Sequence, residues 1–260
     1  MLANHGQEAE AIAVLSQHTR EHPDAHDARR MLIRLYGSAR RLDRAEAEAE
    51  QLAERLGAAS PIPWIELGHA FELARRYPEA LALYDRAARV APTDPSGPRE
   101  GGLRAARWGE AELAAARLEE ALRRDPADAE VWHALGLALV HLGDFAGART
   151  AYERGLIADP RALENHLGLA SLALKQERPA QALTHYDRVL MHKPEFSAGH
   201  LGRSWALILL GRLDEAMEAI ARAEKLGGHA KIVANQRRVI RSLTELSESP
   251  RQGQKTKQIQ

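Results

Sequence analysis

The sequence contains no cysteine among its 260 residues, which excludes disulfide bonds, thiol catalysis and a lipidated N-terminal cysteine. It also has no excess of one charge, because 36 basic residues balance 36 acidic residues. A chain without net charge lacks an overall field that would draw it to nucleic acid or to anionic lipid. No run of 18 apolar residues occurs either, as a membrane-spanning helix would need. From the balanced charge and the lack of such a run, we expect neither a nucleic-acid partner nor a membrane partner.

Signatures of catalysis are scarce as well. The sequence has no phosphate-binding loop, no G-x-S-x-G turn and no S-x-x-K motif. His18, Glu21 and His22 match the H-x-x-E-H zinc-binding string. They lie directly before Pro23, where a helix is expected to end, and no third ligand accompanies them. We therefore favour an ordinary helix end and expect a protein that is not an enzyme and uses no metal or cofactor.

What the sequence does have is a period of 34 residues. Proline recurs at this interval at Pro92, Pro126, Pro160 and Pro194. Alanine stands twelve residues before each of these prolines, and the alanine series continues one period further, at Ala80, Ala114, Ala148, Ala182 and Ala216. A fixed period of this length is typical of a stacked helical repeat. A single unit cannot bury its apolar surface alone, so each unit needs a neighbour.

One repeat, residues 129–162, shows what each unit should be. Apolar residues at spacings of three and four run from Trp132 to Leu142 and again from Phe145 to Leu156. Such spacing places each set on one face of a helix. Gly143 between the two sets tolerates the left-handed conformation that ends a helix, and the aspartate after it is a good N-cap. Each unit is therefore predicted to be a hairpin of two helices of about fourteen residues.

These residues closely resemble the tetratricopeptide repeat. The pattern that carries the resemblance is Trp132-x-x-Leu135-Gly136-x-x-Leu139, then Gly143-Asp144-Phe145-x-x-Ala148-x-x-x-Tyr152, then Asp159-Pro160. The resemblance covers about residues 1–228. It implies an all-α fold, a right-handed superhelical solenoid of stacked antiparallel helix hairpins with a C-terminal capping helix. It also implies a non-catalytic scaffold for protein–protein interaction, which we expect to be monomeric and cytoplasmic.

The period also predicts how the chain is divided. We expect a half repeat over 1–25, the second helix of an incomplete hairpin, in which residues 1–6 are the last turn of a missing first helix. Six full repeats are expected at 26–60, 61–94, 95–128, 129–162, 163–196 and 197–228. In 95–128 the first helix is predicted to start late, after Pro98, which stands where Trp64 and Trp132 stand.

Beyond the repeats we expect a capping helix over 229–246 and a disordered tail over 247–260. The capping helix should pack on the last repeat through an apolar stripe of Ile232, Val239, Leu243 and Leu246. Its opposite face should present basic residues to water, at Arg237, Arg238 and Arg241. A solenoid needs such a helix because its last repeat would otherwise expose apolar surface.

In tetratricopeptide solenoids the first helix of each hairpin lines a concave groove that binds peptides or partner helices. Carried over unit by unit, the resemblance implies groove residues at Arg30, Arg34, Ile65, His69, Glu72, Arg99, Leu103, Arg107, His133, Leu137, His141, Ser171, Lys175 and Trp205. Leu201, Ile208 and Leu209 belong either to the groove or to the packing under the cap. Arginine suits carboxylates, and Trp and Leu suit an apolar anchor. The expected partner is therefore a protein or peptide segment with apolar anchors and acidic residues, extended or helical.

Other interpretations carry less weight. The Lys and Asn clamp of chaperone-binding members is not expected, because none of the three asparagines falls on the groove row. His166 and His200 lie one period apart but share the register of Trp64 and Trp132, so packing is favoured over metal binding. Arginines between 29 and 44 invite a nucleic-acid interpretation. Four glutamates over 46–54 and scarce aromatic residues favour an ion-paired surface there instead.

Two alternatives for function stay open at this stage. One is a regulatory or substrate-recruiting domain of a larger enzyme, a transferase or kinase, whose catalytic part is absent. The other is an assembly factor for a pilus or secretion machine, which would need an export signal. The high Ala and Arg content of the predicted helices indicates a GC-rich bacterial source.

Overall fold

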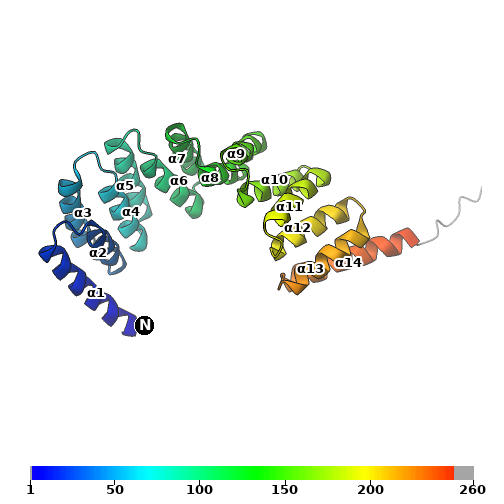
Figure 1. The fold of residues 1–260 in the computed structure, drawn as a ribbon, viewed down its shortest axis with the longest axis horizontal. Helices are drawn as coiled ribbons and strands as arrows, with labels where there is room; N and C mark the ends of the chain where they lie inside the picture. The colour runs from blue at the N-terminus through cyan, green and yellow to red at the C-terminus, as the bar shows by residue number, and fades with distance from the viewer. Residues whose placement is uncertain (1, 249–260) are drawn as a thin grey trace, which may run out of the picture. The chain divides into compact units, whose positions relative to one another are not determined.

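The computed structural model of this chain describes the backbone of residues 2–248 and the side chains of residues 7–246. The described residues form fourteen α-helices and no β-strand (Figure 1). The helices are α1 (Leu2–Glu21), α2 (His26–Ser38), α3 (Leu42–Leu56), α4 (Ile62–Leu73), α5 (Tyr77–Val90), α6 (Ser96–Trp108), α7 (Ala111–Arg124), α8 (Ala129–His141), α9 (Phe145–Ala158), α10 (Leu163–Lys175), α11 (Pro179–His192), α12 (Ser197–Leu209), α13 (Leu213–Lys225) and α14 (Ala230–Glu248). Among them, none is long and apolar enough to cross a lipid bilayer.

The helices belong to two compact units, Met1–Pro160 and Arg161–Gln260, here called the first unit and the second unit. In the first unit, α2 packs on α3, α4 on α5, α6 on α7 and α8 on α9. In the second unit, α10 packs on α11 and α12 on α13. Each second helix also packs on the first helix of the next hairpin within its unit. The predicted all-α class of stacked helical hairpins is therefore confirmed.

Each hairpin turns through one residue in the left-handed conformation, always at the same register. These residues are Arg40, Arg75, Gly109, Gly143, Glu177 and Gly211, with φ between 58° and 85°. Glycine adopts this conformation without a steric penalty, whereas a side chain at positive φ costs about 1–2 kcal/mol. Three of the six turns therefore store strain, at Arg40, Arg75 and Glu177.

Within a hairpin, a small residue on the first helix lies against a large residue on the second. A Cβ added to Gly136 would meet the ring of Tyr152, and one added to Gly68 would meet the ring of Tyr84. Both tyrosines are fully buried, so their rings have no room to move aside. The periodic small residues thus set how closely the two helices of a hairpin approach.

Two expectations about the first unit are wrong in detail. α1 continues without a break through Gly6, so residues 2–6 are part of this helix rather than the end of an earlier one. A glycine inside a helix costs only about 1 kcal/mol, which a long helix tolerates. α6 begins at Ser96, before Pro98 rather than after it. Proline is tolerated in the first helical turn because its missing N–H would have no partner in the helix there.

The capping helix packs through a different face from the one predicted. The buried residues of α14 are Val233, Gln236 and Ile240. Of the predicted stripe, Val239 is partly buried against the core, whereas Ile232, Leu243 and Leu246 are exposed. Gln236 is held by hydrogen bonds, since Ser204 Oγ donates to its Oε1 at 2.7 Å and its Nε2 donates to the carbonyl oxygen of Leu201 at 2.9 Å. The apolar pattern predicted the wrong face because a polar residue, Gln236, occupies the centre of the packing face, where its side-chain oxygen and nitrogen both make hydrogen bonds. α14 ends at Glu248, and the rest of the predicted tail lies outside the described residues.

Candidate functional site

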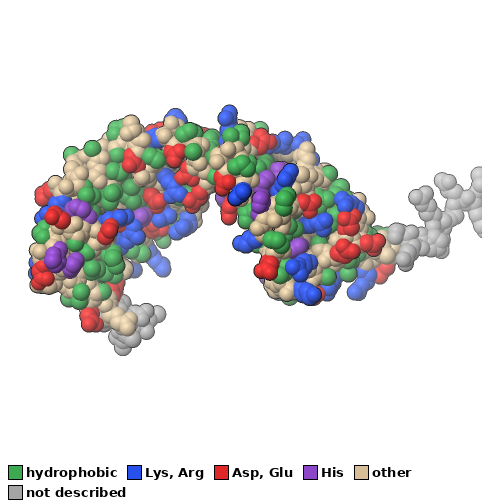
Figure 2. All heavy atoms as spheres, in the orientation of Figure 1, with side chains coloured by type: hydrophobic (Ala, Val, Ile, Leu, Met, Phe, Trp, Pro, Cys, Tyr) green, Lys and Arg blue, Asp and Glu red, His purple; other side chains and the backbone are tan. Residues whose placement is uncertain are grey.

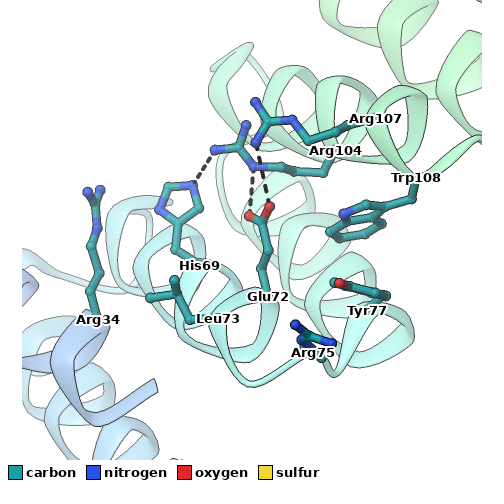
Figure 3. Close-up of a pocket in the computed structure, with 9 residues that line it drawn as sticks. All are labelled: Arg34, His69, Glu72, Leu73, Arg75, Tyr77, Arg104, Arg107 and Trp108. Atoms are coloured by element: carbon teal, nitrogen blue, oxygen red, sulfur yellow. Dashed lines mark hydrogen bonds and ion pairs between the residues drawn. The ribbon is translucent and has the colours of Figure 1, made fainter. Parts of the chain in front are cut away.

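A pocket of about 630 Å³ opens on the first unit where α2, α4 and α6 meet the turn between α4 and α5 (Figure 3). Its lining residues are Arg34, His69, Glu72, Leu73, Arg75, Tyr77, Arg104, Arg107 and Trp108. The structure brings together here four residues predicted for the groove, which are Arg34, His69, Glu72 and Arg107. Figure 2 shows basic and acidic side chains interspersed on the visible surface of each unit, rather than one continuous patch of either sign.

One wall of the pocket is a closed ionic network around Arg104. Its Nε donates to Glu72 Oε2 at 2.8 Å, and its Nη2 lies 3.1 Å from Glu100 Oε2. His69 Nε2 lies 3.3 Å from the same Glu100 oxygen. The side chains of these four residues are only partly exposed. Because acidic and basic groups lie next to one another, their charges are largely neutralised within the protein. The Arg104 wall shapes the pocket and leaves little charge for a ligand.

Two other arginines of the pocket are engaged by acidic groups weakly or not at all within the described residues. Arg107 has a side chain that is 67% exposed, and its nearest acidic oxygen is Glu72 Oε1 at 3.9 Å. Arg75 sits in the strained turn between α4 and α5, and no ion pair of Arg75 is found within the described part of the chain. Figure 3 places the two on opposite sides of Glu72. A guanidinium with unused donors binds carboxylates well, with two parallel hydrogen bonds.

The remaining wall is apolar. Tyr77 and Trp108 face each other with ring centroids 4.6 Å apart and ring planes tilted by 33° (Figure 3). Leu73 and Tyr77 are among the large apolar side chains that stay exposed. Stacked rings offer a broad, rigid apolar surface at low entropic cost. The pocket therefore combines two cations with an aromatic wall.

A second pocket, of about 240 Å³, lies beside α6 and α8 and shares one residue with the first. It is lined by Ala106, Arg107, Gly109, Ala111, Leu137, Ala138 and His141. The predicted groove residues Leu137 and His141 are thus placed next to Arg107. Leu137 is exposed, so this pocket offers an apolar contact adjacent to the same cation.

Three arginines predicted for the groove are already occupied by acids of the protein itself. Arg30 Nε donates to Glu66 Oε1 at 2.8 Å, and Arg34 binds both carboxylate oxygens of Glu66. Arg99 donates to Asp128 Oδ2 at 2.8 Å and also pairs with Glu100 and Glu130. These contacts tie neighbouring hairpins together, so they stabilise the stack rather than wait for a partner.

The other predicted groove residues have mixed positions. Ile65 is buried in the core of the first unit, and Leu103 packs against that core. His133 lies with its ring centroid 5.9 Å from that of Tyr152. In the second unit Ser171 and Lys175 are exposed, and Trp205 packs half-buried against the core. Leu201 and Ile208 are buried and Leu209 is exposed, so the first two belong to the packing.

Sequence reasoning missed Glu66, Arg75, Tyr77, Arg104 and Trp108, but a signal for two of them exists. Pairs of opposite charge recur 32 residues apart, as Arg34 with Glu66, Glu72 with Arg104 and Asp85 with Arg117. The spacing is two residues shorter than the period. Such a pair therefore joins one helix to the corresponding helix of the next hairpin, slightly nearer to its start.

His69 gives the network a dependence on pH. Burial alone would lower the pKa of His69, but the carboxylates of Glu100 and Glu66 outweigh burial and the opposing charge of Arg34, so the pKa is raised above 6.5. Burial likewise opposes ionisation of Glu66, yet hydrogen bonds with His69, Arg34 and Arg30 lower its pKa from 4.5 to about 2. Folding therefore favours the protonated form of His69 and the deprotonated form of Glu66.

These shifts predict that the first unit is most stable between about pH 4.5 and pH 6.5. Above pH 6.5 the contribution of His69 is lost as its raised folded-state pKa is passed. Below pH 4.5 the contribution of Glu66 is lost as the pH approaches 2. Thermal unfolding measured from pH 3 to about pH 9 should show this maximum. His69→Gln should remove the decline on the alkaline side, and an unchanged profile in that variant would contradict the assignment.

The histidines considered as metal ligands are held by other contacts. His200 Nε2 lies 2.8 Å from the carbonyl oxygen of Pro194, which matches the bond from Trp132 Nε1 to Pro126 at 2.9 Å. His166 Nδ1 lies 3.3 Å from His185 Nδ1. In the part of the chain that the structure describes, no three His, Asp or Glu side chains gather as they would around a metal ion.

Comparison with known proteins agrees with the geometry of the hairpins. Family models described as the tetratricopeptide repeat match residues 64–96, 100–162 and 167–230. No curated protein matches the sequence.

Several solved structures share the fold. The C-terminal part of a TPR repeat-containing protein from Cytophaga hutchinsonii has a TM-score of 0.66 and 16% identity, over 89% of this chain and 95% of that one. PilF of Pseudomonas aeruginosa has a TM-score of 0.63 and 19% identity, over 83% and 98%. YrrB, described as a TPR protein with an unusual peptide-binding site, has a TM-score of 0.61 and 16% identity, over 73% and 97%. At these identities the likeness is one of fold alone.

Proposed function

We propose that this chain, which belongs to the tetratricopeptide repeat family, is a scaffold that binds a segment of a partner protein on its first unit. The family fold is generally a non-catalytic interaction scaffold, and the described residues supply a surface for that role. The pocket between α4 and α6 is the anchoring site. The observation that carries the proposal is that two weakly engaged arginines share one pocket with the ring pair of Tyr77 and Trp108. Arg107 has only a long ion pair with Glu72, and Arg75 has none within the described residues.

The pocket selects the chemistry of the segment. A carboxylate can take two hydrogen bonds from the guanidinium of Arg107, which is the stronger kind of pairing because both groups are charged. A bulky apolar side chain next to that carboxylate can lie on the rings of Tyr77 and Trp108. The partner segment is therefore expected to carry an Asp or Glu beside a large apolar residue.

The size and order of the pocket fit this use. A volume of about 630 Å³ lies within the range of about 300–1,000 Å³ that is usual for ligand pockets. The side chains of the Arg104 wall are fixed by ion pairs with Glu72 and Glu100. Because these groups need no reordering on binding, the entropic cost of association falls mainly on the partner segment.

The proposal predicts that Arg107→Glu lowers affinity for the partner by about tenfold or more, because a charged hydrogen bond is replaced by repulsion. The partner can be captured with the wild-type chain and identified, and its binding segment can then be titrated by calorimetry. Arg212→Glu is the matched control, since Arg212 is an equally charged residue of the second unit that pairs with the nearby Glu215. Equal affinity of Arg107→Glu and wild type would disprove the anchoring role.

A second variant separates binding from stability at the strained turn. Arg75→Gly should stabilise the fold by about 1 kcal/mol, because glycine relieves the positive φ, while the loss of its guanidinium weakens binding. Glu177→Gly has the same change of backbone preference in the second unit and should stabilise without affecting binding. Thermal unfolding and calorimetry on both variants test this. Weakened binding in Glu177→Gly, or unchanged binding in Arg75→Gly, would contradict the role of Arg75.

A further inference from the structure

The last helix keeps the register of the repeats. The buried residues Val233 and Ile240 of α14 come 34 residues after Gly199 and Ala206, which are buried on α12. α14 also packs on α12 and α13, much as the first helix α12 packs on the preceding hairpin through α11. In its packing, α14 therefore stands where the first helix of a further hairpin would stand.

This register identifies the face of α14 that a second helix would cover. On α8, the residues toward the second helix α9 are apolar or small and largely buried, at Leu135, Gly136 and Leu139. Three periods later, the same registers on α14 hold basic residues, at Arg237, Arg238 and Arg241. The positions that elsewhere meet a second helix have thus changed from apolar to cationic.

A pocket of about 430 Å³ lies at this place, between α14 and the end of α13. Its lining residues are Glu224, Gly228, Ala230, Val233, Ala234, Arg237, Arg238 and Arg241. Small apolar side chains thus share this pocket with three guanidinium groups. Such a surface suits an amphipathic helix with acidic residues along its contact face.

α13 contributes an apolar residue to the same end of the second unit. Met217 occupies the register of Leu183, which is buried in the core of the second unit with 8% of its surface exposed. Met217 itself is 39% exposed. It lies two helical turns from Glu224 on α13, so the two share a face of that helix. Met217, Ala234, Arg237, Arg238 and Arg241 are together called the end face.

The charge of the end face is only partly neutralised. Arg237 is bound by Glu224, at 3.1 Å and 2.7 Å to its two oxygens. Arg238 donates to Asn235 Oδ1 at 2.8 Å, and neither Arg238 nor Arg241 makes an ion pair within residues 7–246. The sequence after position 248 carries three basic residues and no acidic one. That stretch therefore has no charge complementary to the end face.

We propose that the end face binds an acidic amphipathic helix of a partner protein, which takes the place of the second helix of a further hairpin. Apolar residues of the partner helix cover Met217 and Ala234, and its carboxylates pair with Arg238 and Arg241. An uncharged helix in this place would bury two guanidinium groups without partners, which is strongly unfavourable. The acidic character of the partner follows from that cost.

The test uses the full chain carrying Arg107→Glu, which disables the α4–α6 pocket proposed above, and two synthetic helical peptides of sixteen residues. Both peptides carry leucine on one face, and they differ only in having Glu or Gln at four neighbouring positions. Titration followed by fluorescence anisotropy should show that the Glu peptide binds at least about tenfold more tightly than the Gln peptide. Arg238→Glu with Arg241→Glu should abolish this preference, and a third peptide with Lys at the four positions should then bind that double variant.

The outcomes separate this site from the groove. Because the α4–α6 pocket is disabled by Arg107→Glu, binding of the Glu peptide in this background reports on α14 alone. The double variant at α14, made in the wild-type chain, should leave binding in the α4–α6 pocket unchanged. Equal binding of the Glu and Gln peptides, no binding of either, or no effect of the double variant would overturn the proposal. Each of those results is expected of a face that only keeps the end of the solenoid soluble.

Discussion

Replacing Gly37 with alanine is expected to destabilise the first unit by about 3 kcal/mol, at the upper end of what overpacking usually costs. Gly37 lies on α2 directly against α4, and a Cβ at this position would be 2.5 Å from the carbonyl oxygen of Ala70 and closer still to its Cα. Both are backbone atoms, so no change of rotamer relieves the clash. The two helices would have to separate, and the packing between them would be lost.

Urea unfolding followed by circular dichroism measures this loss, and two variants define its cause. Gly143→Ala places a side chain at a φ of 80° with no atom within 4 Å, so it should cost only the strain of about 1 kcal/mol. Ala70→Gly in the Gly37→Ala background removes one Cβ but leaves the backbone atoms in place, so it should not restore stability. A loss for Gly37→Ala no larger than that for Gly143→Ala would show that the helices can adjust.

The close contact at Gly37 also shows where the sequence stops being informative. The period predicted the hairpins, and the small residues Gly68 and Gly136 recur at one register of that period because each repeats the same local packing. Gly37 is not one of these recurring small residues. It is required by one particular approach between α2 and α4, and a contact that occurs once leaves no periodic trace.

The same limit applies to the candidate site. The family resemblance predicted groove residues along one face of each first helix, and four of these, Arg34, His69, Glu72 and Arg107, line the pocket. It missed Arg75, Tyr77, Arg104 and Trp108, most of which come from helix ends and the α4–α5 turn. One repeat could not predict, either, which of the groove arginines would pair with acidic residues of the protein itself. Their acidic partners lie mainly on the next hairpin, about one period away.

Removal of both Arg30 and Arg34 is expected to destabilise the first unit by about 3–5 kcal/mol at pH 7. Glu66, their shared partner, has a side chain that is only 1% exposed, whereas the two arginines are 40% and 48% exposed. In Arg30→Met/Arg34→Met the carboxylate would stay buried with only His69, 3.7 Å away, as a remaining cation. Glu66→Gln should cost less, about 1 kcal/mol, because the freed arginines regain contact with water.

The pH dependence of the double variant distinguishes this account from a simple loss of packing. In the wild type, the lowered pKa of Glu66 stabilises the fold above pH 4.5 and ceases to do so as the pH falls toward 2. Without the arginines, burial instead raises the pKa of Glu66, so the penalty is full at neutral pH and fades as the carboxyl is protonated. The difference in unfolding free energy between the two proteins should therefore narrow on acidification.

The triple variant Arg30→Met/Arg34→Met/Glu66→Leu completes the test. Because Glu66→Leu removes the buried carboxylate, the loss of the two arginines no longer leaves a buried charge without a partner. It should recover most of the stability lost in the double variant, because apolar residues of similar volume replace a buried ion pair at little cost. Removal of the two arginines is expected to cost more stability than removal of the Glu66 charge. A Glu66→Gln variant less stable than the double arginine variant would contradict this asymmetry. If the asymmetry holds, Arg30 and Arg34 serve the stack of hairpins, and the cations that remain for a partner are those at Arg75 and Arg107.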